Sequence, residues 1–169
     1  ARFRAEIRGE SERLDRVEGR LFQRGCDAVC GDARCGVDLS APAFQGQGVV
    51  TAVLDDQRFL ASGLALFAPG WFAEGALLWT DGVNAGARSA VKAHDKTAGA
   101  DALSLWLPAG RAVAAGDAFT VTAGCDKRAE TCAQKFANLI NFRGFHLMPG
   151  DDFAISYPLK SGKNDGGRR

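Results

Sequence analysis

The stretch GCDKRAETC at residues 124–132 organises the chain, because it carries Cys125 and Cys132, two of the five cysteines. The other three lie far upstream, in the stretch CDAVCGDARC at residues 26–35. Residues 36–124 contain no cysteine. Two cysteine groups so far apart in the sequence predict a single site that the fold closes, with the intervening segment bringing the groups together.

Length and composition set the class of protein. A chain of 169 residues fits one domain with appendages, and its hydrophobic share of 46% is ordinary for a globular protein. With 21 basic and 20 acidic residues the net charge is +1, so nothing favours a nucleic acid or an anionic membrane as partner. We find no apolar run long enough to span a bilayer. Residue 1 is Ala among charged neighbours, and we expect it to be a processed end or an internal position of a longer polypeptide.

The middle of the chain has the pattern of a β-rich domain. Segments 49–54, 59–60, 64–67, 71–80, 87–94, 102–107 and 119–123 are apolar or alternate in polarity, and turn signals such as Pro69-Gly70 and Asp81-Gly82 separate them. Leu103, Leu105 and Leu107 show the period of two most clearly. Short strands with turns about every ten residues predict a small barrel or sandwich of about six strands at about 44–124.

After Cys125 the apolar period becomes helical and predicts a helix over 126–139. Asp126 is the expected N-cap, and Glu130 lies in the first turns, where an acid is favoured. Within such a helix Cys125 and Cys132 would stand about 10 Å apart along the axis. A disulfide needs Cα atoms within about 7 Å, so that pairing is not expected. A cysteine at a helix start would also gain thiolate character from the dipole.

Three chemistries compete for the thiols. Disulfides between the two groups remain allowed, although five is an odd number and the default compartment is reducing. A structural zinc needs four ligands on a small tetrahedron and is usually held by Cys-x2–4-Cys knuckles. The spacing of Cys125 and Cys132 is wider than that. An iron–sulfur cluster also takes four thiolates but spreads them further apart. The spacing of the cysteines alone supports a zinc ion and an iron–sulfur cluster equally. Buried cysteines with no chemical role are a further interpretation.

The cysteine-bearing blocks resemble the baseplate hub, or tail tip, proteins of siphophage-like tails and gene transfer agents, which are similar in role to the tail tip protein L of lambda-type phages. The resemblance runs from about Phe3 to Tyr157. The matching blocks are Cys26, GDARCGVDL at 31–39, GDAF at 116–119, GCDK at 124–127, TC at 131–132, KF at 135–136, Asn138, NFRGF at 141–145, and Pro149, Gly150 and Asp152.

The resemblance implies a structural, non-enzymatic subunit that binds a [4Fe–4S] cluster through Cys26, Cys35, Cys125 and Cys132. Cys30 stands where relatives generally have an apolar residue, and we interpret it as the spare. A site that uses Cys30 in place of Cys26 remains the alternative. The resemblance also implies a homo-oligomeric ring, a trimer being one form. Its neighbours would be other tail tip proteins, namely a distal tail protein and a central fibre (megatron-like) protein, in a virion or gene transfer agent tail tip assembled in the bacterial cytoplasm.

The remaining polar candidates carry weaker signals. His94 is predicted to lie on the surface, and His146 is predicted to have a packing role. The family tends to place a Pro followed by a His in the stretch where this chain has FHLMP at 145–149, so His146 is shifted relative to the family pattern. Lys127 and Arg143 could donate to cluster sulfurs. Without a Gly-x-Ser-x-Gly motif or a Ser/His/Asp arrangement, nucleophilic catalysis has no support. The adjacent acids are predicted to form turns; they are Asp55-Asp56 and Asp151-Asp152. The large aromatic residues are predicted to lie in the core or at a subunit interface; they are Trp71, Phe72, Trp79 and Trp106.

Together these patterns predict a β-rich α+β protein: a small barrel or sandwich inserted between two cysteine-bearing segments, with a C-terminal helix. Residues 1–25 would be a linker arm from an upstream domain, 26–158 the cluster-binding hub C-terminal domain, and 159–169 a flexible tail. A zinc-binding structural adaptor and an electron-transfer iron–sulfur domain are the alternatives from other functional classes.

Overall fold

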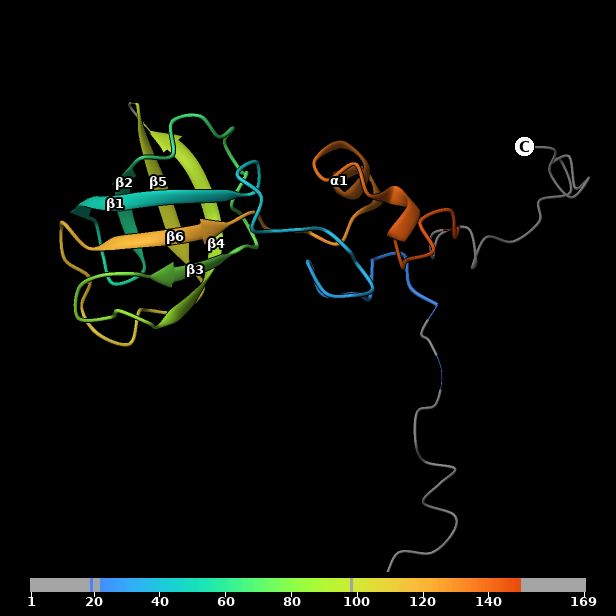
Figure 1. Ribbon diagram of the computed structural model, residues 1–169, viewed down its shortest axis with the longest axis horizontal. Coiled ribbons are helices and arrows are strands. Elements are labelled where there is room, and N and C mark those ends of the chain that lie inside the picture. Colours follow the sequence, from blue (N-terminus) through green and yellow to red (C-terminus); the bar gives the residue numbers. More distant parts are fainter. Residues whose placement is uncertain (1–18, 20–21, 98, 150–169) are drawn as a thin grey trace, which may run out of the picture.

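Six antiparallel strands form a closed barrel in the computed structural model, which describes residues 19, 22–97 and 99–149 (Figure 1). Around the barrel the order is β1-β2-β5-β4-β3-β6, and β6 pairs with β1 to close the sheet. The predicted β-rich α+β fold with a small barrel and a C-terminal helix is confirmed. The strands are β1 (Gln45–Val53), β2 (Arg58–Ser62), β3 (Ala76–Trp79), β4 (Arg88–Thr97), β5 (Ala100–Leu105) and β6 (Ala118–Thr122).

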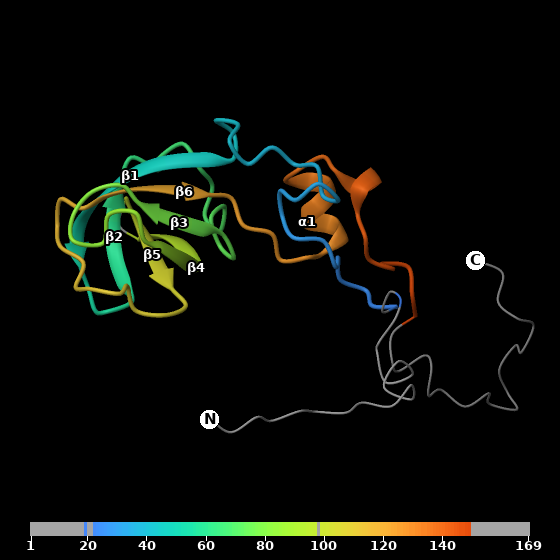
Figure 2. The same ribbon diagram turned by 60° about the horizontal axis from the view of Figure 1, so that its bottom comes forward.

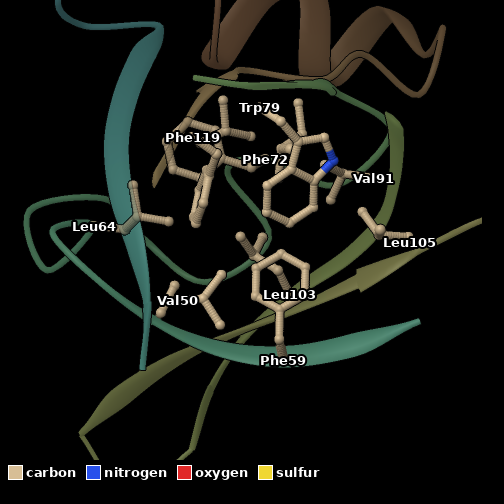
Figure 3. Close-up of a cluster of buried hydrophobic side chains, with 12 residues drawn as sticks. Val50, Phe59, Leu64, Phe72, Trp79, Val91, Leu103, Leu105 and Phe119 are labelled. Carbon is tan, nitrogen blue, oxygen red and sulfur yellow. The ribbon is translucent and has the colours of Figure 1, made fainter. Parts of the chain in front are cut away.

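Alternation of polarity decides which side chains enter the barrel. In β5 every second residue is buried, including Leu103 and Leu105, as the period of two predicts. Leu107 differs and is 75% exposed, because the strand ends at Leu105. Inside the barrel, the Trp79 ring lies 5.6 Å from Phe59 and 5.9 Å from Phe119 between ring centroids (Figure 3). These aromatic contacts and the surrounding aliphatic side chains form one dry core.

The predicted strand segment 64–67 and the first half of the predicted segment 71–80 are turns instead, whereas the second half of 71–80 contains β3. Residues 64–67 and 71–75 form consecutive turns, with Phe67 N–H donating to Leu64 O at 3.0 Å and Ala73 N–H donating to Gly70 O at 3.1 Å. Leu64 and Phe72 are nevertheless fully buried and belong to the barrel core. A plug of apolar turn residues has the composition of a strand, which is why the sequence pattern misplaced these segments.

A second, smaller lobe lies next to the barrel and is built from the chain segments that precede and follow the barrel. It contains residues 22–44, the helix α1 (Ala129–Gln134) and the 3-10 helix η2 (Leu139–Asn141). Figures 1 and 2 both show the two flanking segments lying together, away from the barrel. Their apolar cluster is centred on Val37, Ala123 and Phe136, and the Phe44 ring lies 5.2 Å from the Phe136 ring between centroids, at an angle of 42°. We call this part the cysteine lobe.

Helix α1 is much shorter than the predicted helix over 126–139. It begins at Ala129 with Arg128 in the N-cap position, so Asp126 is not the N-cap. Lys127 has a φ of 66°, and the Asp126 carboxylate accepts hydrogen bonds from Arg128 N–H and from the Thr131 hydroxyl, which forms a turn ahead of the helix. Glu130 does lie in the first turn. Cys125 is therefore outside the helix, and the spacing argument against a Cys125–Cys132 pairing loses its basis.

The prediction that His94 lies on the surface is wrong. Its side chain is 1% exposed inside the barrel, where Nε2 lies 3.1 Å from Oδ1 of Asp101, itself 4% exposed. Lys96 Nζ is 3.8 Å from the same carboxylate oxygen. The His94 ring also packs 5.1 Å from the Phe72 ring. The flanking residues Asp95 and Lys96 are exposed, and the buried residues Val91 and His94 are three apart because the pairing register shifts between Val91 and Ala93, so the local sequence looks like a surface strand.

Replacing His94 by Ala is expected to lower the free energy of unfolding by about 3 kcal/mol. The variant would leave the buried Asp101 carboxylate without its closest partner and create a void beside Phe72, and breaking a buried polar pair from one side is costly. Urea unfolding monitored by tryptophan fluorescence measures the change. Asp95→Ala, at the exposed neighbouring position, is the matched control and should stay within about 0.5 kcal/mol of wild type. Equal stability of the two variants would contradict a structural role for the pair.

The other large aromatic residues divide between core and surface. Phe72 and Trp79 are fully buried, and Trp71 is partly buried between the barrel core and the cysteine lobe. Trp106 is 49% exposed, with Lys92 Nζ 5.3 Å from its ring centroid.

The adjacent acids Asp55-Asp56 form the predicted turn, in which Asp55 accepts hydrogen bonds from the N–H groups of Gln57 and Arg58. The pair Asp151-Asp152, most of the expected arm at 1–25 and the expected tail at 159–169 fall outside the described residues. In the part of the chain that the structure describes, no helix has the length and apolar character needed to cross a membrane.

Candidate functional site

The cysteine lobe brings the two cysteine groups together, although residues 36–124 separate them in sequence. The two segments are joined through the backbone, since Cys26 N–H donates to Lys127 O at 2.9 Å. All five thiols are free; Cys132 is buried and the other four are half-buried. Closing the barrel places its first and last strands, β1 and β6, side by side, so the segments that precede and follow the barrel emerge next to each other.

The sulfurs of Cys26 and Cys35 accept hydrogen bonds from the C-terminal segment. Arg143 N–H donates to Cys26 Sγ at 3.4 Å. The Asn138 side-chain amide donates to the Cys35 carbonyl at 2.6 Å and lies 3.8 Å from Cys35 Sγ. Hydrogen bonds to sulfur stabilise thiolates and tune iron–sulfur centres. Both upstream sulfurs therefore already face donors that would suit a ligating thiolate.

Cys132 lies among the three other cysteines of the predicted ligand set. Burial raises the pKa of the Cys132 thiol, and so do the charges of Cys125, Cys26 and Cys35. Its thiol donates to Asn138 O at 3.4 Å. A bound cation would relieve this penalty at Cys132, because it would favour the thiolate form.

Cys30 is the fifth thiol of the lobe, and Cys125 has the largest influence on its pKa. A hydrogen bond to Cys125 and burial raise the pKa of the Cys30 thiol, with further contributions from the charges of Cys125 and Cys35. The same hydrogen bond, donated by Cys30, is the main cause that lowers the pKa of Cys125 to about 6, helped by the Lys127 N–H and the Lys127 charge. The sequence predicted that a helix start would favour the Cys125 thiolate. In the structure a neighbouring thiol and the N–H of a turn lower the pKa of Cys125 instead.

Two residues to which the sequence analysis assigned no role form hydrogen bonds that position the cysteines. Asp32 carboxylate oxygens accept from the N–H groups of Val29, Arg34 and Cys35, and these hydrogen bonds lower the pKa of the Asp32 carboxyl. Asn138 links Cys35 to Cys132, as described above, and also accepts from the Asn141 amide at 2.7 Å. The spacing Asp32-x-x-Cys35 is the signal for such a turn in the sequence. The cross-segment role of Asn138 has no local signature.

The basic residues beside the cysteines bind the backbone of the lobe. Lys127 Nζ donates to Ala28 O, and Lys135 Nζ donates to Gly124 O at 2.7 Å and to Trp71 O. Burial lowers the pKa of Lys135, whose charge also lies 5.1 Å from the centre of the Trp71 ring. The backbone N–H of Arg143 donates to the sulfur of Cys26. His146 is exposed and packs edge-on against Phe142 at 5.6 Å between ring centroids.

The donor set suits an iron–sulfur cluster in its chemistry. Four thiols from two segments converge, and two of the sulfurs have N–H donors. Among residues 19, 22–97 and 99–149, no three His, Cys, Asp or Glu side chains are placed so that they could hold a metal ion. Around a single zinc, sulfurs bound at about 2.3 Å would lie roughly 3.8 Å apart. A cube-shaped cluster, in which each thiolate binds a different iron, holds them further apart.

Comparison with known proteins gives matches to two families and to chains in solved structures. The family described as baseplate hub protein, N-terminal attachment domain, matches residues 1–38, and phage conserved hypothetical protein BR0599 matches residues 70–152. Cys26, Cys30 and Cys35 fall in the first match and Cys125 and Cys132 in the second. No curated protein matches the chain.

A protein chain from the virion of a native gene transfer agent particle has the same fold. It is 38% identical, with a TM-score of 0.75 over 95% of this chain. The chain spans 55% of the length of that relative. The family matches and this structural likeness, added to the convergent cysteine groups, show that the chain belongs to the tail tip proteins of phages and gene transfer agents.

Proposed function

We propose that the chain is the C-terminal part of a structural hub subunit at the tip of a phage-like tail, and that it binds a [4Fe–4S] cluster through Cys26, Cys35, Cys125 and Cys132. The observation that carries the cluster proposal is the meeting of the two cysteine segments in one lobe, where Cys26 N–H donates to Lys127 O and Asn138 contacts both Cys35 and Cys132. The hub match at 1–38 and the gene transfer agent relative support the structural role and the place in the virion tail.

When bound, the cluster supplies four iron–thiolate bonds that join the upstream cysteine segment to the C-terminal segment. Ligation free energy becomes folding free energy at such a site. The chain's own residues prepare it: the Asp32 turn fixes Cys35, the Arg143 N–H fixes Cys26, and Asn138 connects Cys35 with Cys132. The role is therefore to stiffen the cysteine lobe rather than to turn over a substrate.

The proposed assembly follows from the same family. We infer a homo-oligomeric ring, with a trimer as one form, in contact with a distal tail protein and a central fibre protein. The division into an arm at 1–25, a cluster-binding domain at 26–158 and a tail at 159–169 belongs to this proposal. The matches to a baseplate hub domain and to a chain of a virion support a non-enzymatic role.

Serine variants of single cysteines test the ligand set. Cys132→Ser should abolish cluster binding, because it removes a thiolate from the centre of the group, and the purified protein should lose its iron and its brown colour. Cys30→Ser is the matched control and should keep the wild-type iron content, since the family resemblance leaves Cys30 outside the ligand set. Cys26→Ser should behave like Cys132→Ser. Full iron content in Cys132→Ser, or iron loss in Cys30→Ser with retention in Cys26→Ser, would contradict the ligand assignment.

A further inference from the structure

Lys135 joins the cysteine lobe to the barrel through its side chain. It is the C-cap residue of helix α1, in the cysteine lobe. Its Nζ donates a hydrogen bond to Trp71 O, in the barrel turns at 71–75. A second hydrogen bond, of 2.7 Å, goes to Gly124 O, just after β6. One ammonium therefore binds the backbone of the barrel turns and the backbone of the segment that enters the lobe.

The aromatic rings around this ammonium also come from both parts. Nζ lies 5.1 Å from the ring centroid of Trp71 and 5.3 Å from that of Phe136, which belongs to the apolar cluster of the lobe. Within the described part of the chain, no carboxylate forms a salt bridge with Lys135. A partly buried ammonium is costly unless acceptors replace the water that it loses, and ring faces add to such acceptors. The charge of Lys135 is therefore satisfied by groups at the joint between barrel and lobe.

Trp71 receives further contacts from the lobe. Its indole Nε1 donates to Ala43 O at 3.1 Å, and the Phe44 ring stacks on the indole at 6.4 Å between centroids, with an interplanar angle of 10°. Both residues belong to the upstream segment of the lobe, 22–44. Along the chain Trp71 directly precedes Phe72, which is fully buried in the barrel core. Trp71 is thus the barrel residue against which the lobe is docked.

We propose that Lys135 is a latch between the two parts, so that its hydrogen bond to Trp71 O must break before either the turns at 71–75 or helix α1 can open. The loss of one contact is then common to two local openings on different parts of the chain. A ligand that orders the lobe would consequently protect the barrel turns as well, because coupling free energies are reciprocal. The latch goes beyond the proposed function and does not depend on it, since protein groups alone form it.

Hydrogen exchange resolved to single amides tests the latch in the variant Lys135→Met. Methionine keeps the apolar stem of the side chain but has neither the donor nor the charge. The reporters are the amides of Trp71 and Ala73 on the barrel side and the amide of Cys132 on the lobe side, all of which are hydrogen-bonded. We expect all three to exchange about tenfold faster, as the loss of one charge-assisted hydrogen bond implies.

Lys92→Met is the matched control. Lys92 also lies over a tryptophan ring, that of Trp106, but both residues lie on the barrel, so the control should leave all three reporters unchanged. Faster exchange on only one side of the joint would overturn the latch, because Lys135 would then act locally. Equal acceleration of the Leu103 amide in β5 would also overturn it, since that result means general destabilisation, and so would unchanged exchange at all three reporters.

If Lys135→Met does not fold, Trp71→Phe tests the same joint from the barrel side. Phenylalanine keeps a ring and the backbone carbonyl, but the hydrogen bond to Ala43 O is lost. The Cys132 amide, in the lobe, should then exchange about threefold or more faster, because a hydrogen bond that docks the lobe is missing. Unchanged exchange at Cys132 would contradict the coupling.

Discussion

The variant Gly124→Ala is expected to lose about 3 kcal/mol of stability, through overpacking where the barrel meets the cysteine lobe. A Cβ at residue 124 would lie 1.8 Å from Ala73 O and 2.3 Å from Gly75 N. Both are backbone atoms, so the turn at 73–75 would have to move. Gly124 also accepts the Lys135 hydrogen bond and directly precedes Cys125. The same substitution should therefore displace a proposed ligand as well as destabilise the fold.

Thermal unfolding measures this effect, and for a chain of this size the loss corresponds to a fall in Tm of about 6 to 12 °C. Gly110→Ala is the matched control, because a Cβ there meets nothing within 4 Å and its backbone needs no left-handed conformation. It should leave the Tm nearly unchanged. If Gly124→Ala were as stable as Gly110→Ala, the close approach of the 124 backbone to the turn would have no energetic meaning.

The variant Trp79→Ala is expected to cost about 3 to 5 kcal/mol, the range for removing a large aromatic side chain from a core. Trp79 is fully buried, contacts the rings of Phe59 and Phe119, and donates from Nε1 to Ser89 Oγ at 3.1 Å (Figure 3). Removing the ring would leave a cavity that strands of a closed barrel cannot collapse to fill, because each strand is paired on both edges.

Chemical denaturation measures the loss, and Trp106→Ala serves as control for removing a tryptophan. Trp106 is 49% exposed and its ring contacts the Lys92 ammonium, so removal of the ring should cost about 1 kcal/mol or less. A cost for Trp79→Ala no greater than that of the control would contradict the placement of the ring at the centre of the barrel.

The barrel could be predicted from sequence because its signal is local. Leu103 and Leu105 alternate with partly exposed residues, and turn residues mark the strand ends, so strand type and approximate number follow. His94 was misplaced because its exposed neighbours hide an inward-facing polar pair with Asp101 on the adjacent strand. The pairing of side chains on adjacent strands cannot be predicted from the polarity pattern of one strand.

The meeting of the two cysteine groups was predictable from the sequence, but the local geometry of the lobe was not. The turn at Asp126 that shortens helix α1 depends on the side chain of Thr131. The approach of the upstream segment to Lys127 depends on a backbone hydrogen bond across the lobe, which spacing within one segment cannot reveal. The role of Asn138 as a link between Cys35 and Cys132 is likewise a product of the fold.

Iron and acid-labile sulfide analysis of protein purified without oxygen tests the central claim most directly. The account predicts a brown protein with broad absorbance in the blue, carrying about four irons and about four sulfides per chain, as one [4Fe–4S] cluster requires. A colourless protein with one zinc per chain, or with neither iron nor sulfide after cluster reconstitution, would contradict it.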